Sequence, residues 1–200
     1  MTKASLPVIL LAAGASTRMR GRDKLMEDVD GQPLLRRQTR LALSVGPVMV
    51  ALPPAPHPRY TALTGLDIAP LPIPDASEGM GASLRRAFAA LPPDTAAAMV
   101  MLADMPDLEP SDLACLAASV DLSSETLVWR AATEDGRPGH PIIFAAALFD
   151  QLKRLSGDDG GRAVVRGAGA RVQMVPLPGQ RARLDLDTPE DWAAWRKPQE

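Results

Sequence analysis

The feature that most constrains this chain is a set of short, continuous apolar runs separated by helix-like stretches. The runs at 8–12, 48–52 and 97–103 contain no polar residue, which is typical of strands buried on both faces of a parallel sheet. Between them, 33–45 and 80–91 carry apolar residues at helical spacing, with arginines on the other face. The alternation predicts an α/β fold with a three-layer, mostly parallel sheet and helices on both faces.

The second half of the chain continues the pattern. Three further strand-like segments lie at 126–131, 141–145 and 172–177. A closing helix is predicted at 189–196, because Thr188 suits the N-cap and Pro189 suits the first helical turn. The prolines clustered at 53–58 and 70–74 indicate rigid connections. A length of 200 residues favours a single domain over 1–200.

Composition excludes several classes of protein. The formal net charge is −2 with acids and bases mixed, which argues against a protein built to grip nucleic acid. The single cysteine, Cys115, cannot form an intramolecular disulfide, and we expect it to be a small buried residue. The apolar run 6–13 is too short for a membrane span and leads into charged residues rather than a cleavage site. We expect a soluble, cytoplasmic protein with no membrane contact.

The first predicted strand runs into LAAGASTRMRGRDKL, residues 11–25. A turn rich in Gly and Ser brings backbone N–H groups close to an anion, and Arg18 and Lys24 can add countercharge. The spacing from Gly14 to Gly21 is too long for a P-loop, and no G-x-G-x-x-G dinucleotide fingerprint is present. The segment therefore predicts a phosphate-binding loop of another kind.

Acidic residues follow two other extended segments. Asp104 comes directly after the apolar run 97–103, at the strand end where open sheets bind ligands. Asp185 and Asp187 alternate along an extended chain, so their side chains lie on the same side and can face one cation. Mg²⁺ prefers one or two carboxylates together with substrate phosphates. Taken alone, Asp104 is more simply interpreted as a solvated acid at a strand end; the three acids together predict a magnesium site.

Three glycine-containing segments lie between the first loop and the last acids, at 78–88, 136–144 and 157–162. Glycines before a predicted helix admit a ligand closely. His140 stands between a glycine and a proline at the mouth of a predicted strand, and both a structural and a substrate-contacting role stay open. Arg86 is expected to be an ordinary surface residue.

Six segments in this order resemble the molybdenum cofactor cytidylyltransferase family, within the wider MobA-like group of nucleotidyltransferases with a Rossmann-like sheet. They are LAAGASTRM…DKL, EGMGASL, LADMP, GRPGHPIIF, GDDGGR and DLDTPEDW, and they span residues 11–192. The resemblance implies transfer of CMP from CTP to the phosphate of molybdopterin, with release of pyrophosphate. The LAAG text is associated with cytidine, where guanylyl relatives usually show LAGG.

The resemblance also implies roles for individual residues. Lys24 and Arg18 are the catalytic cations that hold the phosphates. Asp104, Asp185 and Asp187 are the Mg²⁺ ligands, and His140, Asp158 and Arg162 are on the acceptor side. The nucleotide-binding residues are Leu11, Ala12, Ala13, Gly14, Ser16, Glu78, Gly79 and Ser83. The segment 18–24 is one residue longer than the usual family text, so the identity of the acceptor stays open.

No protein nucleophile is needed, since the acceptor phosphate is itself the attacking group. Catalysis would consist of positioning and charge stabilisation. Two alternatives remain: transfer to a sugar phosphate or other small phosphate, and a non-catalytic nucleotide-binding protein that delivers to a molybdoenzyme. A molybdoenzyme or its chaperone is the partner that the resemblance suggests.

Overall fold

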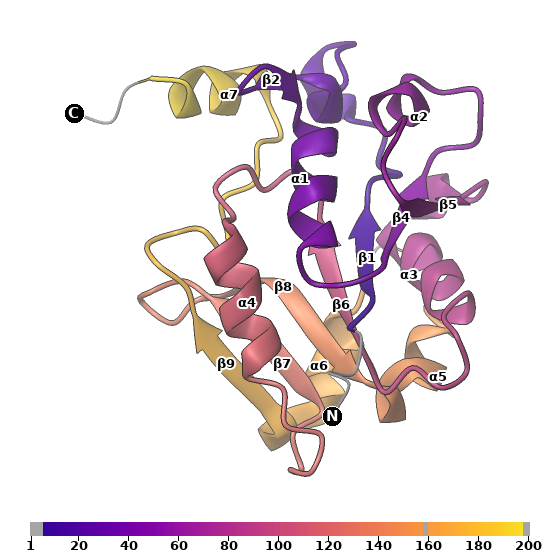
Figure 1. Ribbon diagram of the computed structural model, residues 1–200, viewed down its shortest axis with the longest axis vertical. Helices are drawn as coiled ribbons and strands as arrows, with labels where there is room; N and C mark the ends of the chain where they lie inside the picture. Colours follow the sequence, from indigo (N-terminus) through magenta and orange to yellow (C-terminus); the bar gives the residue numbers. More distant parts are fainter. Residues whose placement is uncertain (1–5, 158–159, 198–200) are drawn as a thin grey trace.

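The computed structural model describes residues 6–157 and 160–197, and its centre is a seven-stranded sheet (Figure 1). The strand order is β5-β4-β1-β6-β8-β7-β9, and β8 runs antiparallel to both of its neighbours. The other pairs are parallel, as predicted. The strands are β1 (Val8–Leu11), β4 (Val48–Leu52), β5 (Ile68–Pro72), β6 (Ala97–Leu102), β7 (Val128–Ala132), β8 (Pro138–Ala145) and β9 (Val172–Pro176); β2 (Asp28–Val29) and β3 (Gln32–Pro33) form a separate hairpin.

Helices cover both faces of the sheet, which gives the predicted three layers (Figure 1). The α-helices are α1 (Leu34–Leu43), α2 (Pro58–Ala62), α3 (Met80–Ala89), α4 (Pro110–Ala118), α5 (Phe149–Leu152), α6 (Arg162–Ala168) and α7 (Pro189–Trp195). Short 3-10 helices are η1 (Thr17–Met19), η2 (Lys24–Met26), η3 (Ala76–Glu78), η4 (Ala146–Leu148) and η5 (Gly169–Arg171). None of the helices in the described ranges is long and apolar enough to span a bilayer.

Side-chain alternation along β1 divides the core in two. Val8 and Leu10 point to the face covered by α1, α4 and α7, where Trp192 of α7 is buried. Ile9 points to the opposite face, which α3, α5 and α6 cover with residues such as Phe88 and Leu152. A strand that packs helices on both sides is apolar at every position, which is why the first run lacks polar residues.

Four expectations from the sequence need correction. The proline cluster at 53–58 ends in a helix, since α2 begins at Pro58. The cluster at 70–74 overlaps β5, an edge strand whose outer side needs no N–H donors, so prolines are tolerated there. Cys115 is exposed on α4 rather than buried. His140 lies inside β8 and not at its mouth, because that strand begins at Pro138.

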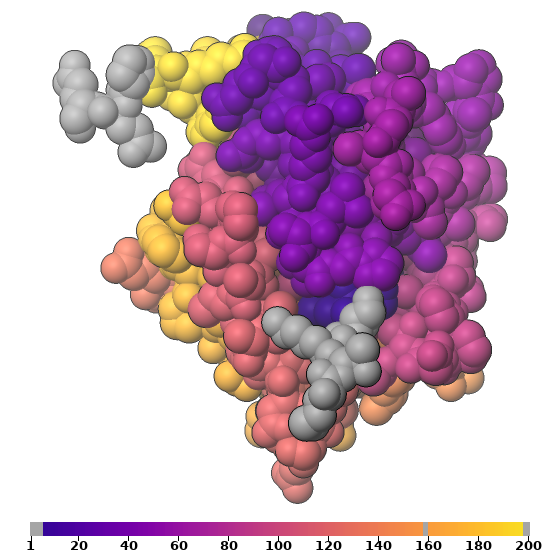
Figure 2. All heavy atoms as spheres, viewed as in Figure 1, coloured from indigo at the N-terminus to yellow at the C-terminus, as the bar shows by residue number. Residues whose placement is uncertain are grey.

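The C-terminal helix packs beside the segment that follows β1. Figure 2 shows the yellow C-terminal spheres against the indigo N-terminal ones at the upper edge of the molecule. Arg20 Nη2 lies 2.6 Å from Glu190 Oε1, and Arg196 Nη2 lies 3.0 Å from Glu27 Oε2. Thr188 caps the helix by accepting from the N–H of Asp191, as its sequence predicted. This packing brings the last acidic segment to the first loop.

Candidate active site

The carboxyl ends of β1 and β6 open onto a cavity of about 460 Å³. The two strands are adjacent and parallel, with Leu11 opposite Leu102, so the segments that follow them meet at one edge of the sheet. Sixteen residues line the cavity: Leu11, Ala12, Ala13, Gly14, Ser16, Thr17, Arg18, Lys24, Leu25, Ala76, Gly79, Met80, Ser83, Leu102, Asp104 and Asp187.

Lys24 stands at the centre of the charged part of this cavity. Its Nζ lies 2.5 Å from Asp104 Oδ2 and 2.6 Å from Asp187 Oδ1. The other oxygen of Asp187, Oδ2, lies 2.6 Å from Arg18 Nη2. Three segments far apart in the sequence therefore meet through one ammonium group, which neutralises two carboxylates at once.

These contacts shift the acid–base properties of the groups. Burial alone would lower the pKa of Lys24, but the two carboxylates outweigh it and raise that pKa above its ordinary value. Burial likewise opposes ionisation of Asp187, yet Lys24 and Arg18 hold its pKa below the usual range. For Asp185, partial burial of the carboxyl group and the neighbouring Asp187 and Asp104 raise the pKa to about 6. A cation bound beside Asp185 would lower that pKa.

The three acids fit a divalent metal ion. One carboxylate oxygen each from Asp104, Asp185 and Asp187 lies within 4.8 Å of the others. Asp104 Oδ1 is buried, and within the described part of the chain it has no hydrogen-bond partner. A buried carboxylate oxygen without a donor is costly, and a hard cation would satisfy it. The donor set, oxygen only, is the kind that Mg²⁺ or Mn²⁺ takes.

The uncharged half of the cavity is made by backbone and small side chains. Ala13 is 7% exposed and its methyl group packs in a small cluster with Ala51, Ile73 and Ala82. A Cβ built on Gly14 would meet nothing within 4 Å, so packing alone does not require glycine there. Gly79, by contrast, has φ 104°, a conformation that side chains rarely adopt.

The edge of the cavity at η3 and α3 is held by ion pairs. Arg85 Nη2 lies 2.6 Å from Asp75 Oδ2 and 3.0 Å from Glu78 Oε2. Arg86 Nε also pairs with Asp75, at 2.5 Å, and its side chain is exposed, so it is a surface residue, as expected. Glu78 itself does not line the cavity. Its carboxylate instead helps to fix the turn that presents Gly79.

Two of the predicted acceptor-side residues, His140 and Arg162, lie in a basic cluster with Arg130 and Arg183. His140 and Arg162 do not line the cavity, and Asp158 lies outside the described residues. Arg130 Nε donates to the carbonyl of Gly139, 3.0 Å away, and the N–H of His140 donates to Ala182 O, 2.8 Å away.

Burial and the positive charges of the cluster lower the pKa values of its members. Burial, followed by the charges of Arg130 and Arg162, lowers the pKa of His140 to about 4, so its imidazole is neutral at pH 7. Burial and the charges of Arg162 and Arg183 lower the pKa of Arg130 as well. His140 Nδ1 is buried and lacks a hydrogen-bond partner among the residues described. The cluster is therefore suited to an anion.

The sequence did not predict every residue of the site. Arg59 of α2 and Asp23 of the first loop form a buried ion pair directly behind the cavity, with Nη2 2.7 Å from Oδ1. The position of Asp23 directly before Lys24 in the loop could have indicated a role in the site. Nothing in the sequence around Arg59 indicated such a role, because it follows a proline cluster and its partner, Asp23, is 36 residues away.

Comparison with known proteins agrees with this geometry. Residues 8–174 match the MobA-like NTP transferase domain. The chain belongs to that family. It is therefore a nucleotidyltransferase of the MobA-like type, and solved structures of similar proteins share its fold.

Individual proteins that are similar to this chain match nearly its whole length. A probable molybdenum cofactor guanylyltransferase of Synechococcus elongatus is 28% identical over an alignment of 190 residues that covers 92% of this chain and 95% of that protein. The crystal structure of Rv0371c from Mycobacterium tuberculosis H37Rv is 28% identical, with a TM-score of 0.82 over 97% of this chain and 98% of the other. A structure of Rv0371c complexed with manganese is 25% identical, with a TM-score of 0.76 over 95% and 97% of the two chains.

Proposed function

We propose that this chain, as a single domain over residues 1–200, transfers a nucleoside monophosphate from an NTP to the phosphate of molybdopterin and releases pyrophosphate. The observation that carries the proposal is the convergence of Lys24 and Arg18 on the acids Asp104 and Asp187 at the strand ends. Cations that can grip a triphosphate and carboxylates that can hold a metal lie in one cavity. That combination suits phosphoryl chemistry that needs no protein nucleophile.

Asp104, Asp185 and Asp187 would hold the metal, for which Mg²⁺ is our candidate. When bound, it supplies positive charge to phosphate oxygens. Lys24 pairs with Asp104 and Asp187 through a flexible stem, so its ammonium would be free to turn toward the NTP phosphates when those two carboxylates hold a metal. Arg18, whose side chain is 66% exposed, would close over the same phosphates from the rim. Both cations then offset the charge that develops on the leaving pyrophosphate.

The uncharged half of the cavity would bind the nucleoside. Ala12, Ala13, Gly14 and Ser16 line this half of the cavity, and the space beside Gly14 is open, so a ligand can approach the backbone closely there. Ser83 is buried at the start of α3 and Gly79 presents its backbone from the opposite side. The nucleotide would thus lie between the first loop and α3.

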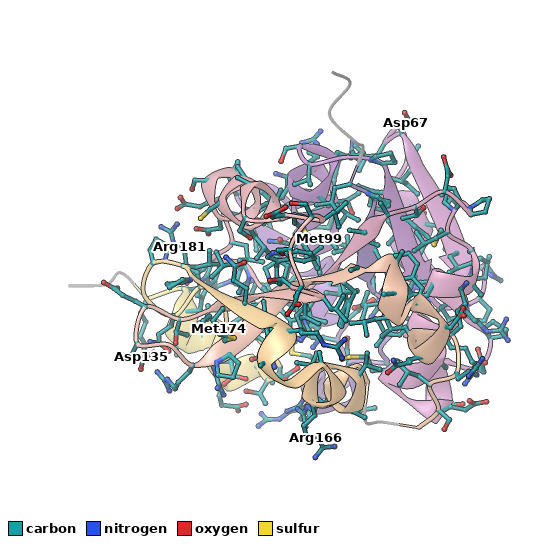
Figure 3. The ribbon with its side chains drawn as sticks, turned by 90° about the horizontal axis from the view of Figure 1, so that it is seen from below. Asp67, Met99, Asp135, Arg166, Met174 and Arg181 are labelled. Carbon is teal, nitrogen blue, oxygen red and sulfur yellow. The ribbon has the colours of Figure 1, made fainter. Side chains whose placement is uncertain are left out.

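The acceptor would bind through the basic cluster of Arg130, His140, Arg162 and Arg183. Arg130 lies opposite Met174 in the parallel pair of β7 and β9, and Figure 3 labels Met174. Mutual repulsion among guanidinium groups is relieved when an anion binds between them. The neutral imidazole of His140 can donate or accept a hydrogen bond from the same ligand.

Two bases compete as the NTP substrate. CTP is our first candidate, because Ala13 adds a methyl group at the wall of the cavity and a pyrimidine is smaller than a purine. GTP is the second, because the Synechococcus relative is named a guanylyltransferase. A sugar phosphate in place of molybdopterin remains the competing acceptor.

A matrix of CTP, GTP, ATP and UTP against molybdopterin and small sugar phosphates tests the proposal, with pyrophosphate release as the readout. We expect release only with molybdopterin, only with a divalent metal, and fastest with CTP. Faster release with GTP would replace the cytidylyl assignment and keep the chemistry. Tight NTP binding without pyrophosphate release from any pair would instead favour a non-catalytic delivery protein.

A further inference from the structure

Arg59 is a buried charge that touches both ends of the first loop. The residue is 1% exposed. Its Nε lies 2.8 Å from Asp23 Oδ2 and its Nη2 lies 2.7 Å from Asp23 Oδ1, so the carboxylate is held in both arms of the guanidinium fork. Nη1 donates to Ala12 O at 2.6 Å, and Nη2 reaches Ser16 Oγ at 3.3 Å. One side chain of α2 thus joins the loop where it leaves β1 and where it reaches Lys24.

The loop needs such a support because its backbone is strained. Ser16 has φ 52° and ψ 36°, and Arg20 has φ 53°, both in the left-handed region that residues other than glycine rarely adopt. Strained residues persist only where neighbouring contacts determine their conformation. Ser16 Oγ donates to Asp23 Oδ1 at 3.3 Å and accepts from the N–H of Lys24 at 3.4 Å. The Asp23 carboxylate thus connects the strained residue to the backbone beside Lys24.

Arg59 lies beside a second cavity and does not line the charged one. It lines a second cavity of about 450 Å³, whereas the first cavity, with Lys24 and Asp104, does not include it. The two cavities share the wall Ala13, Gly14, Ser16, Thr17 and Ala76. A change at Arg59 therefore acts on the wall of the NTP cavity from behind, and not on a phosphate or a metal ligand.

We propose that Arg59 is a positioning residue that, with Asp23, holds the first loop in its nucleotide-binding shape and so sets the affinity for NTP. This inference rests on the proposed NTP site. A guanidinium is required, since a lysine ammonium cannot reach two carboxylate oxygens and a backbone carbonyl in one plane. Loss of the support lets the loop leave its strained conformation, and the apparent Kd rises in inverse proportion to the fraction that stays competent.

The test compares Arg59→Met, Arg59→Lys and Asp23→Asn with Arg36→Met as a matched control. Arg36 Nη1 donates to Ala62 O at 2.8 Å and Thr64 O at 3.0 Å, so it fastens the far end of the same helix and lines neither cavity. Calorimetric titration with CTP and with GTP gives Kd, and amide hydrogen exchange reports on segment 12–25. Neither readout needs the acceptor or turnover.

For Arg59→Met and Arg59→Lys we expect Kd for NTP to rise about tenfold, which corresponds to a loop that is competent about a tenth of the time. Amides of 12–25 should exchange faster, while those of β1 and α1 keep wild-type protection. Arg36→Met should leave Kd and loop exchange unchanged. If Arg59→Met does not fold, Asp23→Asn carries the test, because it keeps the shape and removes the charge that Arg59 grips.

Wild-type affinity and loop protection in a folded Arg59 or Asp23 variant would overturn the inference, as would an equal loss in Arg36→Met. Failure of the proposed function looks different. In that case wild-type protein releases no pyrophosphate with any acceptor, yet the variants still differ from it in NTP affinity and in exchange of the first loop.

Discussion

Removal of the Lys24 ammonium should destabilise the metal-free protein and make it more responsive to magnesium. In Lys24→Met, Asp104 and Asp187 lose the cation that lies 2.5 Å and 2.6 Å from their oxygens. The side chains of Lys24, Asp104 and Asp187 are 15–17% exposed. The stability that their ion pairs contribute should therefore lie between that of an exposed bridge, about 1 kcal/mol, and the cost of breaking a buried one, about 3–5 kcal/mol. We expect a loss of about 2 kcal/mol.

For a chain of this length, each kcal/mol moves the melting temperature by about 2–4 °C, so Lys24→Met should melt about 4–8 °C below wild type in EDTA. Magnesium at about a hundred times its Kd adds about 2.7 kcal/mol of stability. In wild type the ion must compete with Lys24 for the same oxygens, so the Mg²⁺-induced shift should be larger in the variant. Turnover should nevertheless fall, because the phosphates lose a cation.

Differential scanning fluorimetry in EDTA and in a Mg²⁺ series measures both effects. Lys153→Met is the matched control: its exposed pair with Asp150, 3.5 Å apart, should change stability by less than about 0.5 kcal/mol and leave the Mg²⁺ response unchanged. Equal melting temperatures of Lys24→Met and wild type in EDTA, or equal Mg²⁺ shifts, would refute the view that Lys24 occupies the cation position.

Other predictions concern the metal, the pH, the base and the acceptor. Asp104→Asn should lower kcat about a hundredfold or more at fixed Mg²⁺ with an unchanged circular dichroism spectrum; near-normal turnover would rule out a metal role. The folded-state pKa of Asp185, about 6, lies above its ordinary 3.8, so the metal-free protein should lose stability as pH rises from 4 to 6 and bind Mn²⁺ more weakly as pH falls through 6. Asp185→Asn should flatten both profiles, and unchanged profiles would contradict the shift. Ala13→Gly should relax preference for CTP over GTP by about 1–3 kcal/mol, measured by competition; an unchanged ratio would remove Ala13 from base selection. Arg130→Gln should raise KM for the acceptor while Arg166→Gln, whose side chain points outward from α6 in Figure 3, should not; equal effects would argue against a defined acceptor site.

The fold was largely predictable from the sequence, because strands that are buried on both faces of a sheet are apolar at every position. The apolar runs at β1, β4 and β6 indicated strands with a layer of helices on each face. Thr188 and Pro189 indicated the start of the last helix. The prediction was wrong for β5 and α2, where proline was taken as a connection. Proline lacks an N–H group, but none is needed at a sheet edge or in a first helical turn. Only the tertiary structure shows that these prolines occupy such positions.

The sequence likewise predicted some residues of the candidate site and missed others. The sequence indicated the loop after β1 and the acids Asp104, Asp185 and Asp187, since strand ends and period-two alternation are local properties of the chain. It did not indicate that Lys24 would lie between two of those acids, nor that Arg59 would hold Asp23 from behind the loop. Both contacts join segments tens to more than a hundred residues apart. Their charges are isolated in the sequence and become paired only when the strands bring those segments to one edge of the sheet.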